Sequence, residues 1–261
     1  MKNDSSQTAV VDAQFGAQAR AYVTSAVHAQ GPDLEAMAAL LGSPGDARVL
    51  DLGCGGGHVS FMAAPRVREV VAYDLSQQML DAVAGVARER GLANIITRQG
   101  VAEKLPFEDA SFDRVLSRYT AHHWADFSAG LREAARVLKP GGQALFVDAI
   151  APGEPATDTF FQGIELLRDR SHVRDYSRAE WEVAIARAGL IPGIVQQFRV
   201  RLDLTAWVTR MRTPELNVQA IRALQQSVPA HIARYFDTAE DGSFTIDVVL
   251  FEAAKPGARA I

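Results

Sequence analysis

The chain has 261 residues, of which 48% are hydrophobic, and carries a formal net charge of −4. Its length and apolar content allow one large domain with a full core, while the slightly acidic balance argues against nucleic acid as a partner. A single cysteine, Cys54, excludes an internal disulfide and a multi-cysteine metal site. The polar start has no apolar leader, and no apolar run approaches the roughly 18 residues of a membrane span. We therefore expect a cytoplasmic protein with no membrane span.

Residues 1–45 are predicted to form a helical N-terminal segment. Helical, alanine-rich patterning runs from Val10 to Leu41 and is interrupted at Gly31-Pro32. Four side chains recur at helical spacing in "QFGAQARAYVTSAVH", which predicts a shared face: Phe15, Ala19, Tyr22 and Ala26.

Residues 46–150 alternate between apolar strands and helices. Strands are predicted at 48–52, 69–75, 94–99, 112–118 and 143–150. One intervening helix has Ser76 as N-cap and Gly91 as its stop, and Lys139-Pro140-Gly141-Gly142 is predicted to turn the chain into the last of these strands. Near-continuous apolar strands separated by helices are typical of a doubly wound α/β fold with a mostly parallel sheet, whose ligands lie beyond the carboxyl ends of the strands.

Residues 151–261 are predicted to complete the same domain with a helical cap on the substrate side. Helices are expected early in this region and at 177–189, a strand at 194–202, mostly helix at 204–236, and a strand at 244–255. The two strands would form a hairpin that closes the sheet edge, with the helical insertion lying over the site.

The stretch "VLDLGCGGGHVSF" runs from the first strand into a glycine-rich turn. A dinucleotide site needs G-x-G-x-x-G, but the third position is His58 in one frame and Ser60 in the other. Asp51, just before the turn, would also repel a pyrophosphate. An NAD-dependent oxidoreductase is therefore the less favoured alternative.

A positively charged ligand reverses this argument. S-adenosylmethionine (SAM) carries a sulfonium and an ammonium, and a carboxylate such as Asp51 at ~4 Å attracts a unit positive charge by roughly 4 kcal/mol at an effective dielectric near 20. Asp74 ends the second strand, where an acid can accept hydrogen bonds from ribose hydroxyls. The residues thus favour SAM as the cofactor.

Five stretches in order carry a family resemblance: "VLDLGCGGGHVS", "VVAYDLSQQML", "GVAEKLPFEDASFDRV", "SRYTAHHWAD" and "ARVLKPGG". They resemble the motifs of class I SAM-dependent methyltransferases, and most closely the type 11 group that includes ubiquinone/menaquinone-biosynthesis C-methyltransferases. The resemblance covers about residues 46–150. It implies a Rossmann-like fold, SAM as cofactor, and transfer of a methyl group to carbon or oxygen of a small-molecule acceptor.

The resemblance also implies a set of cofactor-binding residues. The methionyl end of SAM is expected at the glycine turn, the ribose at the second strand, and the adenine near the residues that follow the second and third strands. The full set is Asp51, Gly53, Cys54, Gly55, Asp74, Leu75, Met79, Val101, Ala102, Glu103, Ser117 and Arg118. The family often has Gly-Asp-Ala-Glu where this chain has Gly100-Val101-Ala102-Glu103, so a backbone carbonyl or Glu103 would have to accept the adenine amino proton.

Methyl transfer from a sulfonium is a direct displacement that depends on holding the nucleophile in line, and a base helps when the acceptor must lose a proton. His122 and His123, after the fourth strand, are the candidate bases. The alternative is that they orient the loop while Trp124 is buried. No metal is predicted, because adjacent histidines without further ligands at suitable spacing are weak evidence for one.

Two further patterns each have two interpretations. Tyr22 belongs to a segment that resembles the lid of related methyltransferases and would then close over the methyl group, or it is simply part of a packing stripe. Several basic side chains after residue 160 would bind an acidic acceptor, or they form a solvated face: Arg168, Arg170, His172, Arg174, Arg210 and Arg212.

Two other functions remain as alternatives. A non-catalytic SAM-binding protein would share the fold, because a fold alone does not establish activity. A nucleic-acid methyltransferase is disfavoured because Ser117-Arg118-Tyr119-Thr120 stands where an Asn-Pro-Pro-Tyr-type catalytic tetrapeptide would follow the fourth strand.

Overall fold

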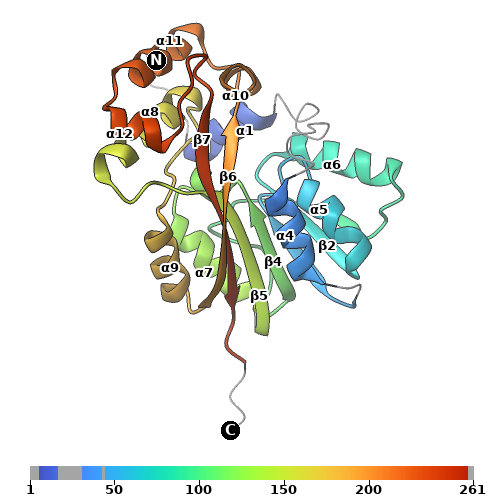
Figure 1. Cartoon of the computed structure of the whole chain (residues 1–261). Helices are drawn as coiled ribbons and strands as arrows, with labels where there is room; N and C mark the ends of the chain where they lie inside the picture. Colours follow the sequence, from blue (N-terminus) through green and yellow to red (C-terminus); the bar gives the residue numbers. More distant parts are fainter. Residues whose placement is uncertain (1–5, 17–30, 43–44, 258–261) are drawn as a thin grey trace.

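The computed structural model describes residues 6–16, 31–42 and 45–257. A seven-stranded sheet in the order β3-β2-β1-β4-β5-β7-β6 forms the centre of the molecule (Figure 1). The strands are β1 Arg48–Leu52, β2 Glu69–Asp74, β3 Ile95–Gln99, β4 Phe112–Arg118, β5 Leu138–Ala149, β6 Ile191–Leu202 and β7 Phe244–Ala254. Strands β1 to β5 are parallel, and β7 is antiparallel to both of its neighbours. The predicted doubly wound, mostly parallel α/β fold is confirmed.

Helices cover both faces of this sheet. Helices α4 (Pro32–Leu41), α5 (His58–Ala63) and α6 (Gln77–Glu89) pack on one face, and α7 (Phe127–Val137) and α9 (Arg178–Arg187) pack on the other. Adjacent residues of a strand therefore both become buried, as Val49 and Leu50 are. This two-sided burial is the reason that the parallel strands read as continuous apolar runs.

The predicted turn at Lys139–Gly142 lies inside a strand. Strand β5 begins at Leu138, which pairs with Phe112, and the register with β4 shifts between Phe112 and Arg114. Gly141 has a φ of 78°, and a Cβ on Gly142 would lie 2.9 Å from the carbonyl oxygen of Lys139. The glycine pair therefore permits an irregular crowded stretch within the strand rather than a turn before it.

The region after β5 follows the predicted order. Helices α8 (Pro155–Arg168) and α9 precede β6, and α10 (Leu204–Arg210), α11 (Glu215–Ser227) and α12 (Ala230–Tyr235) lie between β6 and β7. Helices α8, α10, α11 and α12 gather beyond the end of the sheet at which β5 and β6 finish (Figure 1). The antiparallel β6–β7 pair closes the sheet edge as expected.

Helix α1 (Gln7–Gly16) joins this helical end to the rest of the molecule. Gln7 Nε2 donates to the carbonyl oxygen of Ser171 at 2.7 Å, and Gln14 Nε2 donates to that of Met211 at 2.9 Å. Among the described residues, no helix has both the length and the apolar character that crossing a membrane requires.

Candidate active site

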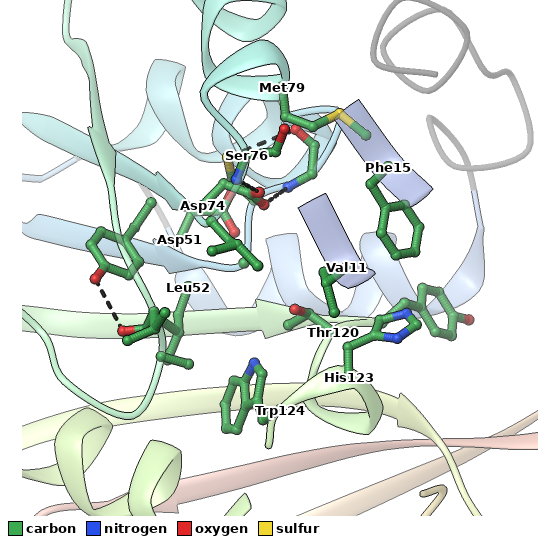
Figure 2. Close-up of a pocket in the computed structure, with 18 of the residues that line it drawn as sticks. Val11, Phe15, Asp51, Leu52, Asp74, Ser76, Met79, Thr120, His123 and Trp124 are labelled. Atoms are coloured by element: carbon green, nitrogen blue, oxygen red, sulfur yellow. Dashed lines mark hydrogen bonds between the residues drawn. The ribbon is translucent and has the colours of Figure 1, made fainter. Parts of the chain in front are cut away.

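A cavity opens at the carboxyl ends of β1, β2 and β4 (Figure 2). Helix α1 forms one wall through Gln7, Thr8, Val11 and Phe15, and the segment from Arg118 to Ala125 forms another. The glycine turn, the start of α6 and residues 100–103 supply the remainder. The cavity thus lies where a doubly wound sheet places its ligand.

The glycine turn uses its glycines for backbone geometry. Gly53, Gly55 and Gly57 all have positive φ, at 74°, 46° and 77°. A Cβ on Gly53 would lie 2.2 Å from Thr120 Oγ1, so only glycine allows the turn to approach the segment after β4 this closely. Cys54 is buried in the same turn, and burial raises the pKa of its thiol.

Asp51 presents a buried carboxyl group to the cavity. Its side chain is 1% exposed, and Ser60 Oγ donates a hydrogen bond of 2.6 Å to its Oδ2. Burial outweighs this hydrogen bond and raises the pKa of Asp51 from 3.8 to about 7. A ligand cation nearby would favour the ionised form, because its charge stabilises the carboxylate in place of the hydration lost on burial.

Asp74 lies beside Asp51 and holds the loop around the cavity (Figure 2). Its Oδ2 accepts from the Gly55 backbone N–H at 2.8 Å, and its Oδ1 accepts from that of Ser76 at 2.9 Å. Burial raises its pKa. Each carboxylate oxygen keeps a further lone pair, so Asp74 retains the capacity to accept from ligand hydroxyls.

Ser76 differs from its predicted role. It occupies the N-cap position of α6, but its side chain makes no capping hydrogen bond. Its Oγ is buried without a hydrogen-bond partner among the described residues, and the residue lines the cavity next to Asp74. A ligand hydroxyl or amino group would satisfy this oxygen.

The two expected adenine acceptors are engaged elsewhere. The carbonyl oxygen of Val101 accepts from Tyr73 Oη at 3.0 Å, and Glu103 Oε1 accepts from the backbone N–H groups of Ala125 and Asp126 at 2.8 and 3.3 Å. Glu103 therefore fixes the wall after β4. Leu75, Met79 and Ala102 line the same side of the cavity.

Of the two cofactor-binding residues expected at the end of β4, only one lines the cavity. Ser117 is 2% exposed and is not part of the cavity wall, because its side chain lies inside the protein. Arg118 does line the cavity, but its Nε donates to Asp33 Oδ2 in α4, and both side chains are less than 10% exposed. Arg118 thus also ties α4 to the sheet.

The candidate bases lie in the short 3₁₀ helix Ala121–His123, and only His123 lines the cavity. Its Nδ1 is 3.1 Å from the carbonyl oxygen of Ser171, its Nε2 is 3.9 Å from Asp169 Oδ2, and its ring contacts that of Phe15 edge-on at 4.9 Å. Burial lowers its pKa to about 3.

His122 is not part of the described cavity wall. Its Nδ1 is 2.6 Å from Asp148 Oδ1. Burial alone would lower the pKa of His122, but the charge of Asp148 and this hydrogen bond outweigh it and raise the pKa to about 9. Trp124 is 6% exposed, as the packing interpretation of this segment predicts. Tyr22 lies outside the described residues.

Comparison with known proteins gives the family. Residues 50–146 match a methyltransferase domain of type 11. The chain is 50% identical over 199 residues to the uncharacterized protein YafE of Escherichia coli, covering 76% of this chain and 96% of YafE. It is 38% identical over 200 residues to the uncharacterized methyltransferase YcgJ of Bacillus subtilis, covering 77% of this chain and 79% of YcgJ. The chain belongs to the class I SAM-dependent methyltransferases.

The fold and a more distant relationship agree with this family. The crystal structure of YcgJ superposes with a TM-score of 0.83 at 32% identity, covering 87% of this chain and 99% of YcgJ. A 2-phytyl-1,4-naphtoquinone methyltransferase of Synechococcus elongatus is 39% identical over 123 residues, which is 46% of this chain and 52% of that enzyme. The expected likeness to quinone C-methyltransferases is therefore confirmed at the level of homology.

Two arginines in the basic cluster of this methyltransferase pair with neighbouring acids. Arg168 pairs with Glu165 at 3.1 Å, and Arg174 pairs with Asp158 at 3.0 Å. His172 is buried against Gln162, and none of the six basic side chains lines the described cavity. The described residues of the helical insertion do not line this cavity, but α1 does, and Gln14 of α1 donates to the carbonyl oxygen of Met211 in the insertion.

Sequence reasoning did not identify several wall residues. Val11 lies in a stretch whose patterning showed only that it is helical, and Thr8 precedes that stretch although it lies within α1. Thr120 is marked only by its closeness to Gly53. Tyr119, which also lines the cavity, has a φ of 53°, an unfavourable conformation for a bulky residue. Such backbone strain is common at functional sites but leaves no signal in one sequence.

Proposed function

We propose that this methyltransferase binds SAM in the cavity between α1 and the glycine turn and transfers its methyl group to a small-molecule acceptor. The observation that carries this proposal is the pair of carboxyl groups, buried Asp51 and half-buried Asp74, that line one cavity at neighbouring strand ends. Asp51 suits the positively charged methionyl end, and Asp74 suits the ribose hydroxyls.

The residues present fit this cofactor. Asp51 is a buried carboxyl group for which no ion pair is found among the described residues, and burial raises its pKa to about 7. Ser76 Oγ is a buried hydroxyl without a partner in the described structure, and it adjoins the proposed ribose site. Leu75 and Met79 supply apolar surface beside it for a base.

SAM supplies an electrophilic methyl group, and the chain supplies position and exclusion of water. Val11 and Phe15 of α1 face the segment after β4 across the cavity and would cover the reacting groups (Figure 2). The two ring nitrogens of His123 lie near Ser171 and Asp169, two residues that do not line the described cavity. We therefore assign His123 a role in shaping the wall.

This geometry favours acceptors that arrive ionised or react without giving a proton to the protein. Carboxylates, phenolates and readily ionised quinols meet this condition. The naphthoquinone methyltransferase relative matches only 46% of the chain, so that relationship supports methyl transfer and leaves carbon and oxygen acceptors both open.

Calorimetric titration tests the cofactor assignment. We expect SAM and S-adenosylhomocysteine to bind with one site per chain and NAD to bind negligibly, and we expect Asp74→Asn to weaken SAM binding at least tenfold. Tight NAD binding without SAM binding would reject the proposal. A screen for S-adenosylhomocysteine release with quinols, phenols and carboxylic acids then identifies the acceptor class and separates catalysis from binding alone.

A further inference from the structure

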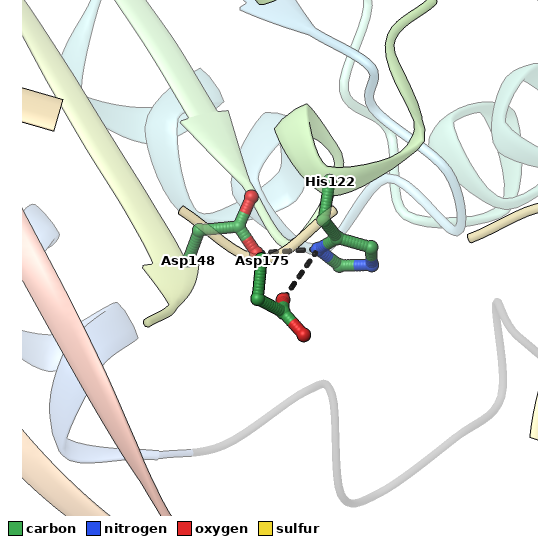
Figure 3. A group of neighbouring side chains, drawn as sticks. All are labelled: His122, Asp148 and Asp175. Atoms are coloured by element: carbon green, nitrogen blue, oxygen red, sulfur yellow. Dashed lines mark hydrogen bonds and ion pairs between the residues drawn. The ribbon is translucent and has the colours of Figure 1, made fainter. Parts of the chain in front are cut away.

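A second buried polar site lies behind the wall of the cavity. His122, Asp148 and Asp175 converge there from three different segments: the 3₁₀ helix after β4, the end of β5, and the connection between α8 and α9 (Figure 3). One donor atom from each of the three residues lies within 4.8 Å of the other two. From this arrangement we infer that His122, Asp148 and Asp175 bind a divalent transition-metal ion, with Zn²⁺ as the best-fitting probe.

The charges of this site are only partly matched. Asp148 accepts from the backbone N–H groups of Ala121 and Ala149, both at 3.0 Å, as well as contacting His122. Asp175, in contrast, is 2% exposed, and its Oδ2 has no hydrogen-bond partner in the described part of the chain. A buried carboxylate needs a cation or hydrogen bonds, so a divalent ion would supply what Asp175 lacks.

The nearest alternative donor cannot serve Asp175. His172 Nε2 is 3.9 Å from Asp175 Oδ2, but it is 3.0 Å from Gln162 Oε1. The Gln162 amide is fixed, because its Nε2 donates to Asp158 Oδ1 and to the carbonyl oxygen of Asp175, both at 2.8 Å. Its oxygen therefore accepts, His172 Nε2 must donate to it, and Asp175 Oδ2 is left without that proton.

The distances suit zinc after small movements, with the ion taking the place of the proton that His122 Nδ1 directs at Asp148; that proton is released to solvent. Ligand atoms at about 2.0–2.1 Å from a tetrahedral zinc ion lie about 3.3 Å from one another. His122 Nδ1 is 2.6 Å from Asp148 Oδ1 and 4.0 Å from Asp175 Oδ1, so one separation must widen and the other shorten by about 0.7 Å each. One imidazole and two carboxylates also form a donor set that accepts zinc or manganese.

An ion at this position would stabilise the active-site wall. His122 and His123 are adjacent, and their ring centroids are 4.1 Å apart. Binding at His122 would hold the 3₁₀ helix against β5 and against the connection after α8. The sequence predicted no metal because the other two ligands come from distant segments that only the fold brings to His122.

Binding of Co²⁺ and Zn²⁺ to the full chain, freed of metal by a chelator, tests this inference. We expect the wild-type chain to bind one equivalent of Co²⁺ with visible d–d absorption, which Zn²⁺ then displaces. Asp175→Asn and His122→Ala should weaken binding at least tenfold. His231→Ala is the matched control, because His231 faces Glu154 at 3.9 Å on the surface and should leave binding unchanged.

Asp175→Asn decides the outcome even if His122→Ala does not fold. We expect Asp175→Asn to fold, because asparagine has the shape of aspartate and Asp175 Oδ2 makes no hydrogen bond in the described structure. We expect Zn²⁺ to raise the melting temperature of the wild-type and His231→Ala chains and to leave that of Asp175→Asn unchanged. Failure of the wild-type chain to bind Co²⁺, or wild-type affinity in Asp175→Asn, would overturn the inference. SAM titration of the same samples reports separately on the proposed cofactor site.

Discussion

Asp51 allows the sharpest test of the proposed cofactor site, because ionisation of this one carboxyl group should lower the free energy of unfolding and strengthen SAM binding. Its pKa rises from 3.8 in the unfolded chain to about 7 in the folded chain, and the main cause is burial. The folded state therefore binds more protons than the unfolded state between these two pH values. The free energy of unfolding should fall as pH rises through this window and level off above pH 7.

The magnitude follows from the size of this shift. About three pKa units at 1.36 kcal/mol each give about 4 kcal/mol of destabilisation by Asp51 above pH 7, undiscounted because the side chain is buried. Asp51→Asn keeps the shape and can still accept from Ser60, but it cannot ionise. We therefore expect this variant to be more stable than wild type at pH 8 by up to about 4 kcal/mol, with the difference disappearing near pH 4.

Cofactor binding should respond in the opposite direction. SAM requires the ionised carboxylate, so its affinity for the wild-type chain should fall by up to tenfold for each pH unit below 7. Asp51→Asn should bind SAM weakly, with little dependence on pH. Urea unfolding and calorimetric titration of both chains from pH 5 to 8 measure these effects. The electrostatic reasoning is refuted if both chains share one pH profile, or if Asp51→Asn binds SAM as well as wild type does.

Three further substitutions test other parts of the site. Asp74→Ala removes the acceptor for the backbone N–H groups of Gly55 and Ser76 as well as for ribose, so it should destabilise the chain by about 2–4 kcal/mol. Asp74→Asn should mainly weaken SAM binding. Equal melting temperatures for Asp74→Ala and wild type would contradict this. Phe15→Ala opens the α1 wall and should raise the KM for the acceptor more than it lowers kcat, which steady-state kinetics can show once an acceptor is found. His123→Gln should lower kcat less than tenfold, because the ring nitrogens lie near Ser171 and Asp169, whereas loss of a general base would cost about 10²–10⁴-fold.

The core was predictable because its signals are local in sequence. The apolar strands, the glycine turn and the acids at the ends of β1 and β2 each lie within a few residues, and alternation of elements fixes a parallel sheet. The predicted turn at Lys139–Gly142 was wrong for a physical reason. Pairing of Leu138 with Phe112 extends the strand through the glycines, and no local pattern reports that contact.

The substrate side was less predictable because it depends on contacts between distant segments. Helix α1 lines the cavity, and Gln14 joins it to Met211 in the helical insertion, 197 residues further along the chain. Arg118 lines the cavity and also pairs with Asp33, and His122, a candidate base, pairs with Asp148. In each case the partner lies far away in sequence, so residue type and order alone could not determine the role.

Unsatisfied buried groups provide a more direct guide to ligands than sequence position does. The described residues contain four buried side-chain polar atoms without a hydrogen bond, in Ser76, Asp175, Trp181 and Asp247. The atom in Asp247 still has a cation, Arg199, at 3.8 Å, and Trp181 is packed in the aromatic core, stacked on a phenylalanine ring. The other two adjoin places where a ligand is proposed on separate grounds: Ser76 beside the ribose site, and Asp175 beside His122. Because each unpaired group costs stability in the ligand-free protein, a ligand that satisfies it gains that free energy on binding.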